Sequence, residues 1–219
     1  MSETFEIARK NMVVNQLRPN KINEENILQI FENTPKENYL DVSLGKNCYL
    51  DNNLDITEKR GYLKNLHLAQ IIKYSKILPN DKVLHIGGLT GYFSALISSL
   101  CQELHVVEEN RELFKLLEHN ISNTDTSNIS LFNHNLLDGL VDKAPFNLII
   151  IDGPIFKITD NLKKQLVTNG GTLIYIKKIY DNLGKAYKVI RNEDLYSSEY
   201  LFDVMSAYQI QEQQEGFKF

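Results

Sequence analysis

The sequence predicts an α/β fold built on a doubly wound, mostly parallel sheet. Short apolar runs rich in β-branched residues alternate with segments of helical spacing along most of the chain. A glycine cluster at 87–91 joins one such run to a helix. Another run, 148–151, is apolar without alternation, which is typical of a strand buried on both faces. The 219 residues therefore suit one large domain with a small N-terminal addition.

The stretch 83–92 organises the rest of the chain. Its apolar run ends at Gly87, and Phe93, Leu96 and Ile97 then recur at helical spacing, so we predict a strand, a tight turn and a helix. Glycines let a ligand approach the backbone closely, and a helix N-terminus presents unpaired N–H groups. The next strand, 104–107, ends at Glu108, about 20 residues after the first glycine, where an acid that binds a ribose is expected.

The turn and the acid together predict an adenosine-containing ligand. Because a carboxylate accepts two hydrogen bonds from neighbouring hydroxyls, Glu108 is the preferred ribose ligand, whereas Glu109 suits an exposed surface charge. Asp152 closes the buried run and lies where ligands bind in open α/β sheets, although an acid there also suits a turn or a helix cap. His85 faces the predicted pocket, either as a titrating group or as a hydrogen-bonded core histidine.

The remaining elements follow from periodicity and turn signals. We predict helices at 4–17, 64–76, 111–121 and 160–167, a helix capped by Asn23 that ends before Pro35, strands at 129–132, 145–154 and 172–176, and an antiparallel hairpin of 186–191 and 199–208. The first two helices are expected to cap the sheet edge. The segment 36–61 is expected to be a substrate-facing loop with a short hairpin near Tyr49, and the tail 211–215 to be exposed. Residues 1–62 thus form a cap and loop, and 63–219 one compact domain.

Composition excludes several classes of protein. The net charge is -4 and no basic run exists, which argues against nucleic-acid binding, and no segment has the roughly 20 apolar residues of a membrane span. The acidic N-terminus lacks a signal-peptide core, so a cytoplasmic location is expected. Cys48 and Cys101 are expected to be reduced thiols, and the five histidines lack metal-ligand spacing. No serine has a nucleophile-elbow setting. The oligomeric state stays open.

Several motifs resemble one family over nearly the full length. They are 12–20, 83–92, Ala144-Pro145-Phe146, Gln165-Leu166 with Gly170-Gly171, and 216–219. On these residues the chain resembles the protein-L-isoaspartate O-methyltransferase family, specifically its alphaproteobacterial branch. The resemblance implies a seven-stranded, Rossmann-like fold, S-adenosylmethionine as cofactor, and a protein or peptide substrate whose isoaspartyl carboxylate is esterified for repair. It also implies a set of cofactor-binding positions: His85, Gly87, Gly88, Leu89, Thr90, Gly91, Glu108 and Asn135.

The chain departs from the family pattern at five positions. His85 and Asn135 stand where the family has acids, Asn147 replaces the acid that opens the fourth strand, and the middle glycine of the turn is Leu89. The family's hydroxyl residue, counted without gaps from Val83, falls on Leu63; beside it only Tyr62 offers a hydroxyl, so the catalytic residue stays unknown, with Asp152 as a candidate. Two alternatives to the methyltransferase are a catalytically silent binding or interaction module and, more weakly, a nicotinamide-dependent dehydrogenase.

Overall fold

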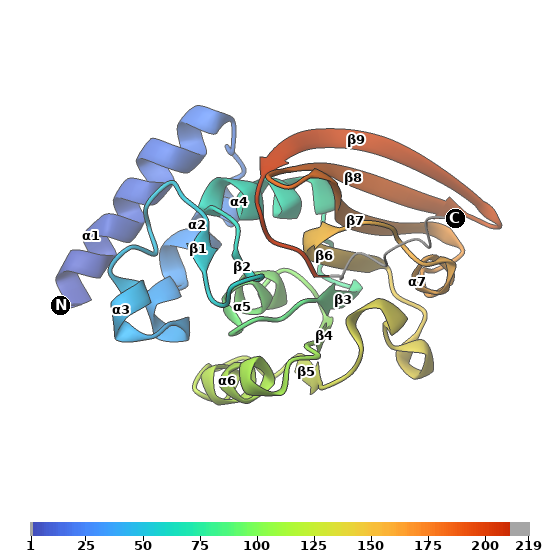
Figure 1. The fold of residues 1–219 in the computed structure, drawn as a ribbon, viewed down its shortest axis with the longest axis horizontal. Helices are drawn as coiled ribbons and strands as arrows, with labels where there is room; N and C mark the ends of the chain where they lie inside the picture. Colours follow the sequence, from blue (N-terminus) through green and yellow to red (C-terminus); the bar gives the residue numbers. More distant parts are fainter. Residues whose placement is uncertain (1, 211–219) are drawn as a thin grey trace, which may run out of the picture.

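The computed structural model describes residues 2–210 and has a seven-stranded sheet in the order β5-β4-β3-β6-β7-β8-β9 (Figure 1). The strands are β3 (Lys82–Ile86), β4 (Glu103–Val107), β5 (Ile129–Phe132), β6 (Leu148–Ile155), β7 (Asn169–Tyr180), β8 (Leu183–Asn192) and β9 (Leu195–Met205). Strands β3 to β7 are parallel, and β8 and β9 run antiparallel to their neighbours. This arrangement confirms the predicted seven-stranded, mostly parallel sheet and its C-terminal hairpin.

Helices flank the sheet. They are α1 (Ser2–Met12), which continues as a π-helix (Val13–Leu17) and a 3₁₀ turn (Arg18–Asn20), α2 (Glu25–Asn33), α3 (Val42–Gly45), α4 (Asn65–Ser75), α5 (Tyr92–Ser98), α6 (Arg111–Ser122) and α7 (Asp160–Lys164). Short 3₁₀ turns cover Lys36–Tyr39, Leu136–Asp138 and Val141–Lys143. The predicted helices at 4–17, 64–76 and 111–121 are all present.

The central strands divide the core into two layers. Val83 and Ile150 pack into the larger apolar cluster, whereas Leu84 and Ile151, one position further along the same strands, pack into the smaller one. This alternation arises because successive side chains on a strand point to opposite faces. The unbroken apolar run of β6 is therefore buried on both faces, as predicted.

The order of the strands locates the functional crevice. From β3 the chain passes to β4 on one side, and β6 pairs with β3 on the other side. The connections thus diverge at the carboxyl ends of β3 and β6, which is the point where open α/β sheets bind ligands. The glycine turn follows β3 directly at this point.

Three predictions about the N-terminal part were wrong in detail. The N-cap of α2 is Glu24, because Asn23 instead donates its backbone N–H to the Glu24 side chain. Outside the N-terminal cap itself, α2 and the π-helix contact α4, which packs on β6 and β7, so the cap covers that helix rather than a sheet edge (Figure 1). The hairpin lies at β1 (Leu54–Asp55) and β2 (Gly61–Tyr62), not near Tyr49.

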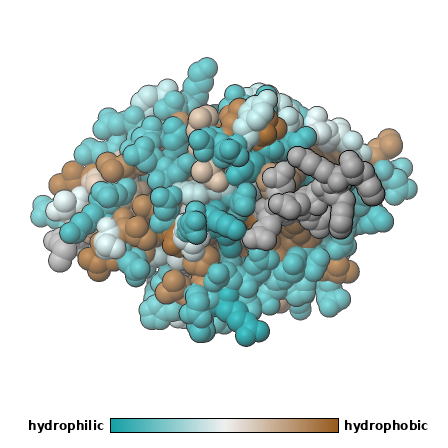
Figure 2. Space-filling view, in the orientation of Figure 1, coloured by the Kyte–Doolittle hydropathy of each residue, from teal (hydrophilic) through white to brown (hydrophobic). Residues whose placement is uncertain are grey.

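The surface seen in Figure 2 is mostly hydrophilic, with hydrophobic residues gathered on the side of the molecule that carries α1 and α3. Ile7 on α1 and Val42 on α3 are among the exposed apolar side chains. Within residues 2–210, no helix is both long enough and apolar enough to cross a bilayer. Cys48 and Cys101 are buried free thiols, as expected. The predicted tail 211–215 and the motif 216–219 lie outside the described residues.

Candidate functional site

The turn between β3 and α5 depends on backbone conformations that favour glycine. Gly87 and Gly91 have φ values of 99° and 103°, in the left-handed region. A Cβ at Gly88 would lie 2.7 Å from Val106 and 2.8 Å from Leu117, so only glycine fits there. Leu89 also adopts a positive φ, 49°, which is strained for a bulky residue.

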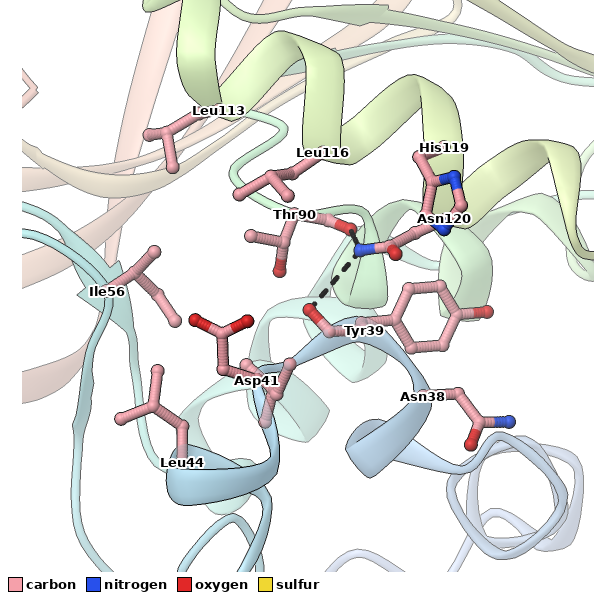
Figure 3. A pocket seen from close by; sticks show the side chains of 11 residues that line it. Asn38, Tyr39, Asp41, Leu44, Ile56, Thr90, Leu113, Leu116, His119 and Asn120 are labelled. Atoms are coloured by element: carbon pink, nitrogen blue, oxygen red, sulfur yellow. Dashed lines mark hydrogen bonds between the residues drawn. The ribbon is translucent and has the colours of Figure 1, made fainter.

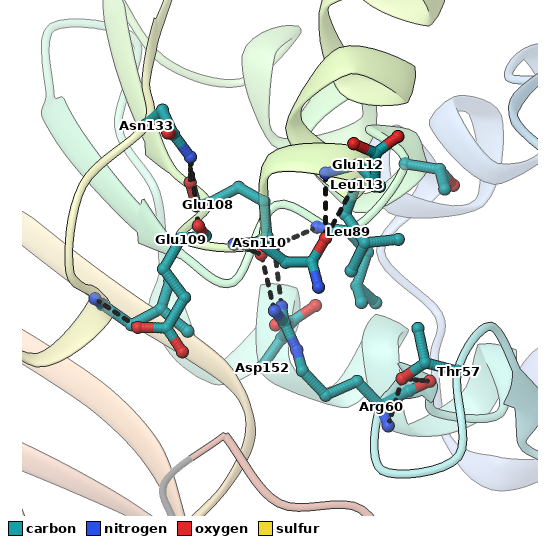
Figure 4. A network of polar contacts seen from close by, with 12 residues as sticks. Thr57, Arg60, Leu89, Glu108, Glu109, Asn110, Glu112, Leu113, Asn133 and Asp152 are labelled. Atoms are coloured by element: carbon teal, nitrogen blue, oxygen red, sulfur yellow. Dashed lines mark hydrogen bonds and ion pairs between the residues drawn. The ribbon is translucent and has the colours of Figure 1, made fainter.

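Glu108 lies at the end of β4 with its carboxylate fully buried. Its Oε1 accepts hydrogen bonds from Arg60 Nη1 at 2.6 Å and from the backbone N–H of Asn110 at 2.9 Å. Its Oε2 accepts from Arg60 Nη2 at 2.7 Å and from the backbone N–H of Leu89 at 3.0 Å (Figure 4). In this positive-φ conformation, the backbone N–H of Leu89 points toward Glu108, the acid predicted from the sequence as the ribose ligand.

Arg60, which sequence reasoning missed, reaches this acid from the turn of the β1–β2 hairpin. The turn is closed by hydrogen bonds between the backbones of Thr57 and Arg60, at 2.8 Å, and from the Arg60 N–H to Thr57 Oγ1, at 3.0 Å. Burial disfavours the charged guanidinium, but the hydrogen bonds and charge of Glu108 outweigh it and raise the pKa of Arg60. The result is a buried, bidentate ion pair between two residues far apart in the sequence.

A small hollow lies beside this ion pair at the carboxyl ends of β3 and β6. Arg60, Gly87, Leu89, Asp152 and Ile210 are among the residues that line it, and its free volume is about 10 Å³. That volume holds about one water molecule at most. The side chain of Ile210 closes the hollow from the outside, since a Cβ at Gly87 would lie 3.2 Å from its Cδ1.

Asp152 and His85 lie together at the edge of this hollow. Residues 150 and 154 of β6 pair with 174 and 176 of β7, so four steps on one strand oppose two on the other, and the extra residues form a bulge around Asp152. Asp152 is 5% exposed and is neither a helix cap nor part of a tight turn. His85 is fully buried, with its Nδ1 2.9 Å from Ser94 Oγ and its Nε2 3.5 Å from Asp152 Oδ1. His85 is thus a buried histidine that is hydrogen-bonded through Nδ1, while its Nε2 has no hydrogen-bond partner among the described residues. Its contact with a cofactor stays a prediction.

Tyr62 holds the glycine turn through hydrogen bonds of its hydroxyl. Leu63, which we predicted at the family's hydroxyl position, is buried and apolar, whereas the hydroxyl of Tyr62 accepts hydrogen bonds from the backbone N–H groups of Thr90 and Tyr92 at 3.2 and 3.0 Å. It also lies 2.9 Å from Thr90 Oγ1. Burial raises the pKa of this hydroxyl, so it stays protonated. Tyr62, the neighbour of Leu63 in sequence, therefore uses its hydroxyl to hold the glycine turn in place.

Replacing Tyr62 by phenylalanine is expected to lower the free energy of unfolding by about 2 kcal/mol, because two buried N–H groups lose their acceptor. Urea denaturation measures this change. Tyr180→Phe is the matched control, since Tyr180 is 72% exposed and should change stability by less than about 0.5 kcal/mol. A Tyr62→Phe protein as stable as the wild type would show that the hydroxyl does not support the turn.

Asn135 and Asn147, which we predicted to replace acids of the family, both accept hydrogen bonds from backbone N–H groups. Asn135 is exposed and caps the turn Leu136–Asp138 by accepting hydrogen bonds from Leu137 and Asp138. Asn147 Oδ1 accepts from the N–H of Lys82 at 2.9 Å, which ties the beginnings of β6 and β3 together. Contact of Asn135 with a cofactor stays a prediction.

A larger cavity, of about 450 Å³, lies on the other side of the turn (Figure 3). Its walls are α6, the 3₁₀ turn Lys36–Tyr39 and part of the segment predicted to face the substrate, including Asp41 and Ile56. Asn120 on α6 donates from Nδ2 to the carbonyl oxygens of Thr90, at 2.8 Å, and Tyr39, at 3.3 Å. Asn120 on α6 thus links Thr90 of the glycine turn to Tyr39 of the segment 36–61, which we predicted to face the substrate.

Comparisons with known proteins agree on one family. The family model described as protein-L-isoaspartate(D-aspartate) O-methyltransferase matches residues 8–205. A protein-L-isoaspartate O-methyltransferase of Shewanella woodyi is 30% identical over 91% of this chain and 92% of its own length. One from Koribacter versatilis is 28% identical over 78% of this chain and 77% of its own.

A solved protein-L-isoaspartate O-methyltransferase has the same fold as this chain. The two superimpose with a TM-score of 0.78 at 18% identity, over 91% of this chain and 65% of that protein. The likeness confirms the Rossmann-like methyltransferase fold. The more specific alphaproteobacterial assignment stays a prediction.

Proposed function

Because this chain belongs to the protein-L-isoaspartate O-methyltransferase family, we propose that it transfers a methyl group from S-adenosylmethionine to isoaspartyl carboxylates in protein or peptide substrates. The observation that carries the proposal is the family match over residues 8–205, which includes the glycine turn and the buried acid after β4. Neither the catalytically silent module nor the dehydrogenase is favoured by this family.

The residues around the crevice suit the nucleoside part of that cofactor. Glu108 presents a carboxylate beside a turn whose Gly87 lines the hollow without a side chain, and a carboxylate is a good acceptor for the two hydroxyls of a ribose. The space does not suit it in the conformation described, because Arg60 and Ile210 fill the hollow. The residues therefore fit the cofactor, while the conformation is closed.

The chemistry asks the chain mainly for positioning. The cofactor supplies an activated methyl group, so the protein has to hold a substrate carboxylate oxygen in line with it and keep water out. Asp152, only 5% exposed, is the acidic side chain that lines the hollow from the bulge of β6. A carboxylate there disfavours a second carboxylate in contact with it, so we expect Asp152 to border the site rather than to bind the substrate directly.

Two measurements on the full chain test the proposal. Isothermal titration with S-adenosylhomocysteine, the demethylated product, is expected to show binding. Radiolabelled methyl transfer is expected to an isoaspartyl peptide and not to the same peptide with an ordinary aspartate. Equal labelling of both peptides, or labelling of neither at saturating cofactor, would overturn the proposed activity.

A further inference from the structure

We propose that Arg60 is a built-in competitor of the cofactor: its guanidinium occupies the two acceptor positions of Glu108 that a ribose diol needs, so binding requires Arg60 to leave. This inference rests on the proposed function. It concerns a residue that the family resemblance did not select. Its basis is the set of contacts on Glu108 and the space around them.

The first step is the number of hydrogen bonds that Glu108 can accept. A carboxylate offers about four acceptor positions. Two are taken by the backbone N–H groups of Leu89 and Asn110, which belong to the site itself. The other two are taken by the Nη atoms of Arg60, one on each oxygen. A vicinal diol also donates one hydrogen bond to each oxygen, so it can only replace the guanidinium and cannot be added to it.

The second step is space. The hollow next to the ion pair has a free volume of about 10 Å³, whereas sites for ligands of drug size or larger occupy about 300–1,000 Å³. The parts of its wall that lie outside the seven-stranded sheet and the glycine turn are Arg60 and Gly61 of the hairpin and residues 208–210. Among them, Arg60 and Ile210 have the side chains that come nearest to Gly87. Moving these two side chains is therefore the way to enlarge the hollow without disturbing the turn.

The third step is the segment that must move. The hairpin carrying Arg60 is joined to the last described residues: Tyr208 Oη donates to Asp55 Oδ1 at 2.6 Å, and the N–H of Gln209 donates to the carbonyl oxygen of Lys59 at 3.0 Å. We call residues 55–61 together with 208–210 the flap, which leaves out Tyr62 because that residue holds the glycine turn. The strands β1 and β2 have only two residues each, and the turn between them lies at the surface. Short, exposed elements of this kind open at low free-energy cost.

A cavity of about 370 Å³ lies outside the closed hollow, between the flap and the start of α6. Thr57, Arg60, Glu109 and Asn110 are among its lining residues. Arg60 thus separates this open cavity from the hollow. A nucleoside that enters from the side of Glu109 meets the guanidinium before it meets Glu108.

The competition has a measurable size. If the open state is a fraction of the population, the apparent dissociation constant rises by the inverse of that fraction. Arg60→Gln removes the charge and the bidentate fork, and we expect it to bind S-adenosylhomocysteine about 10- to 100-fold more tightly than the wild type. Arg60→Lys keeps the charge without the fork and should fall between the two. Arg111→Gln, at an exposed arginine at the start of α6, is the matched control and should bind like the wild type.

Titration calorimetry with S-adenosylhomocysteine on the four full-length proteins is the experiment. Equal or weaker binding by Arg60→Gln, with Arg111→Gln unchanged, would overturn the competition and leave the proposed function intact. If none of the four binds, both the competition and the proposed function fail.

Hydrogen exchange on the wild type provides a second readout that does not depend on a variant folding. Saturating S-adenosylhomocysteine is expected to speed exchange in residues 55–61, because the flap is released, and to slow it in 83–92. Unchanged or slower exchange in the flap would contradict the proposal, because it would show that the ligand binds without displacing Arg60.

Discussion

Glu108→Gln is expected to lower the free energy of unfolding by about 3 kcal/mol, because breaking a buried ion pair by removing one partner leaves an uncompensated charge. The carboxylate is fully buried and the side chain of Arg60 is only 12% exposed. Glutamine keeps the shape of the side chain, but its amide presents N–H groups to a site whose neighbours, the backbones of Leu89 and Asn110, are themselves donors. The substitution therefore loses charge and also sets donors against donors.

Urea denaturation of a double-mutant cycle tests this expectation. The cycle consists of Glu108→Gln, Arg60→Gln and the double variant, and we expect the double variant to be more stable than the sum of the single losses predicts, since it leaves no unpaired charge. Glu109→Gln is the matched control, because Glu109 is exposed. A loss below about 1 kcal/mol for Glu108→Gln would mean that Arg60 turns to solvent at little cost.

Lys36→Met is expected to stabilise the protein at pH 7, by up to about 3 kcal/mol. Lys36 is buried, and its ammonium has Asn65 Oδ1 at 3.0 Å and the rings of Tyr62 and Tyr92 at 5.2 and 5.1 Å. Burial lowers the pKa of Lys36 to about 8, from 10.5. Below about pH 8 the folded state therefore carries a poorly solvated charge that the unfolded state holds in water.

The sign of the pH dependence follows from this direction. Between about pH 8 and 10.5 the unfolded state binds more protons at Lys36 than the folded state, so the contribution of this group to stability rises with pH. The advantage of Lys36→Met should accordingly shrink from pH 7 to pH 9.5, as measured by urea denaturation at both values. Lys46→Met, at an exposed position, is the control. A variant less stable than the wild type at pH 7 would show that the aromatic rings and Asn65 more than offset the cost of burial.

The sequence predicted the centre of the sheet well because its signals are local. The β3 strand, the glycine turn and Glu108 follow from an apolar run, a glycine cluster and a fixed spacing, and all three are found where they were expected. The β1–β2 hairpin was misplaced because strands of two residues have no periodicity to detect. The N-cap at Asn23 was wrong because a residue of the right type need not adopt the capping geometry.

Arg60 was missed because its role depends on a contact across 48 residues of sequence. Nothing around Thr57 and Arg60 distinguishes that arginine from a surface charge. A signal did exist in Glu108: an acid at the end of a buried strand needs a counter-charge or several N–H donors if no ligand is bound. Glu108 therefore needs a partner, but its sequence position does not identify one. The fold identifies the partner as Arg60.

The bulge around Asp152 has a consequence for how this strand can change. Since β6 takes four steps where β7 takes two, it carries two additional residues, an even number. Ile150 before the bulge lies in the larger apolar cluster, while Ile149 and Ile155 on either side of the bulge both lie in the smaller one, so the strand leaves the bulge in phase with its beginning. Losing one residue here would turn Ile155 toward the wrong layer, whereas losing two would preserve the hydrophobic layers and erase the protrusion that carries the carboxylate. Natural variation in the length of this strand is therefore expected to occur in pairs.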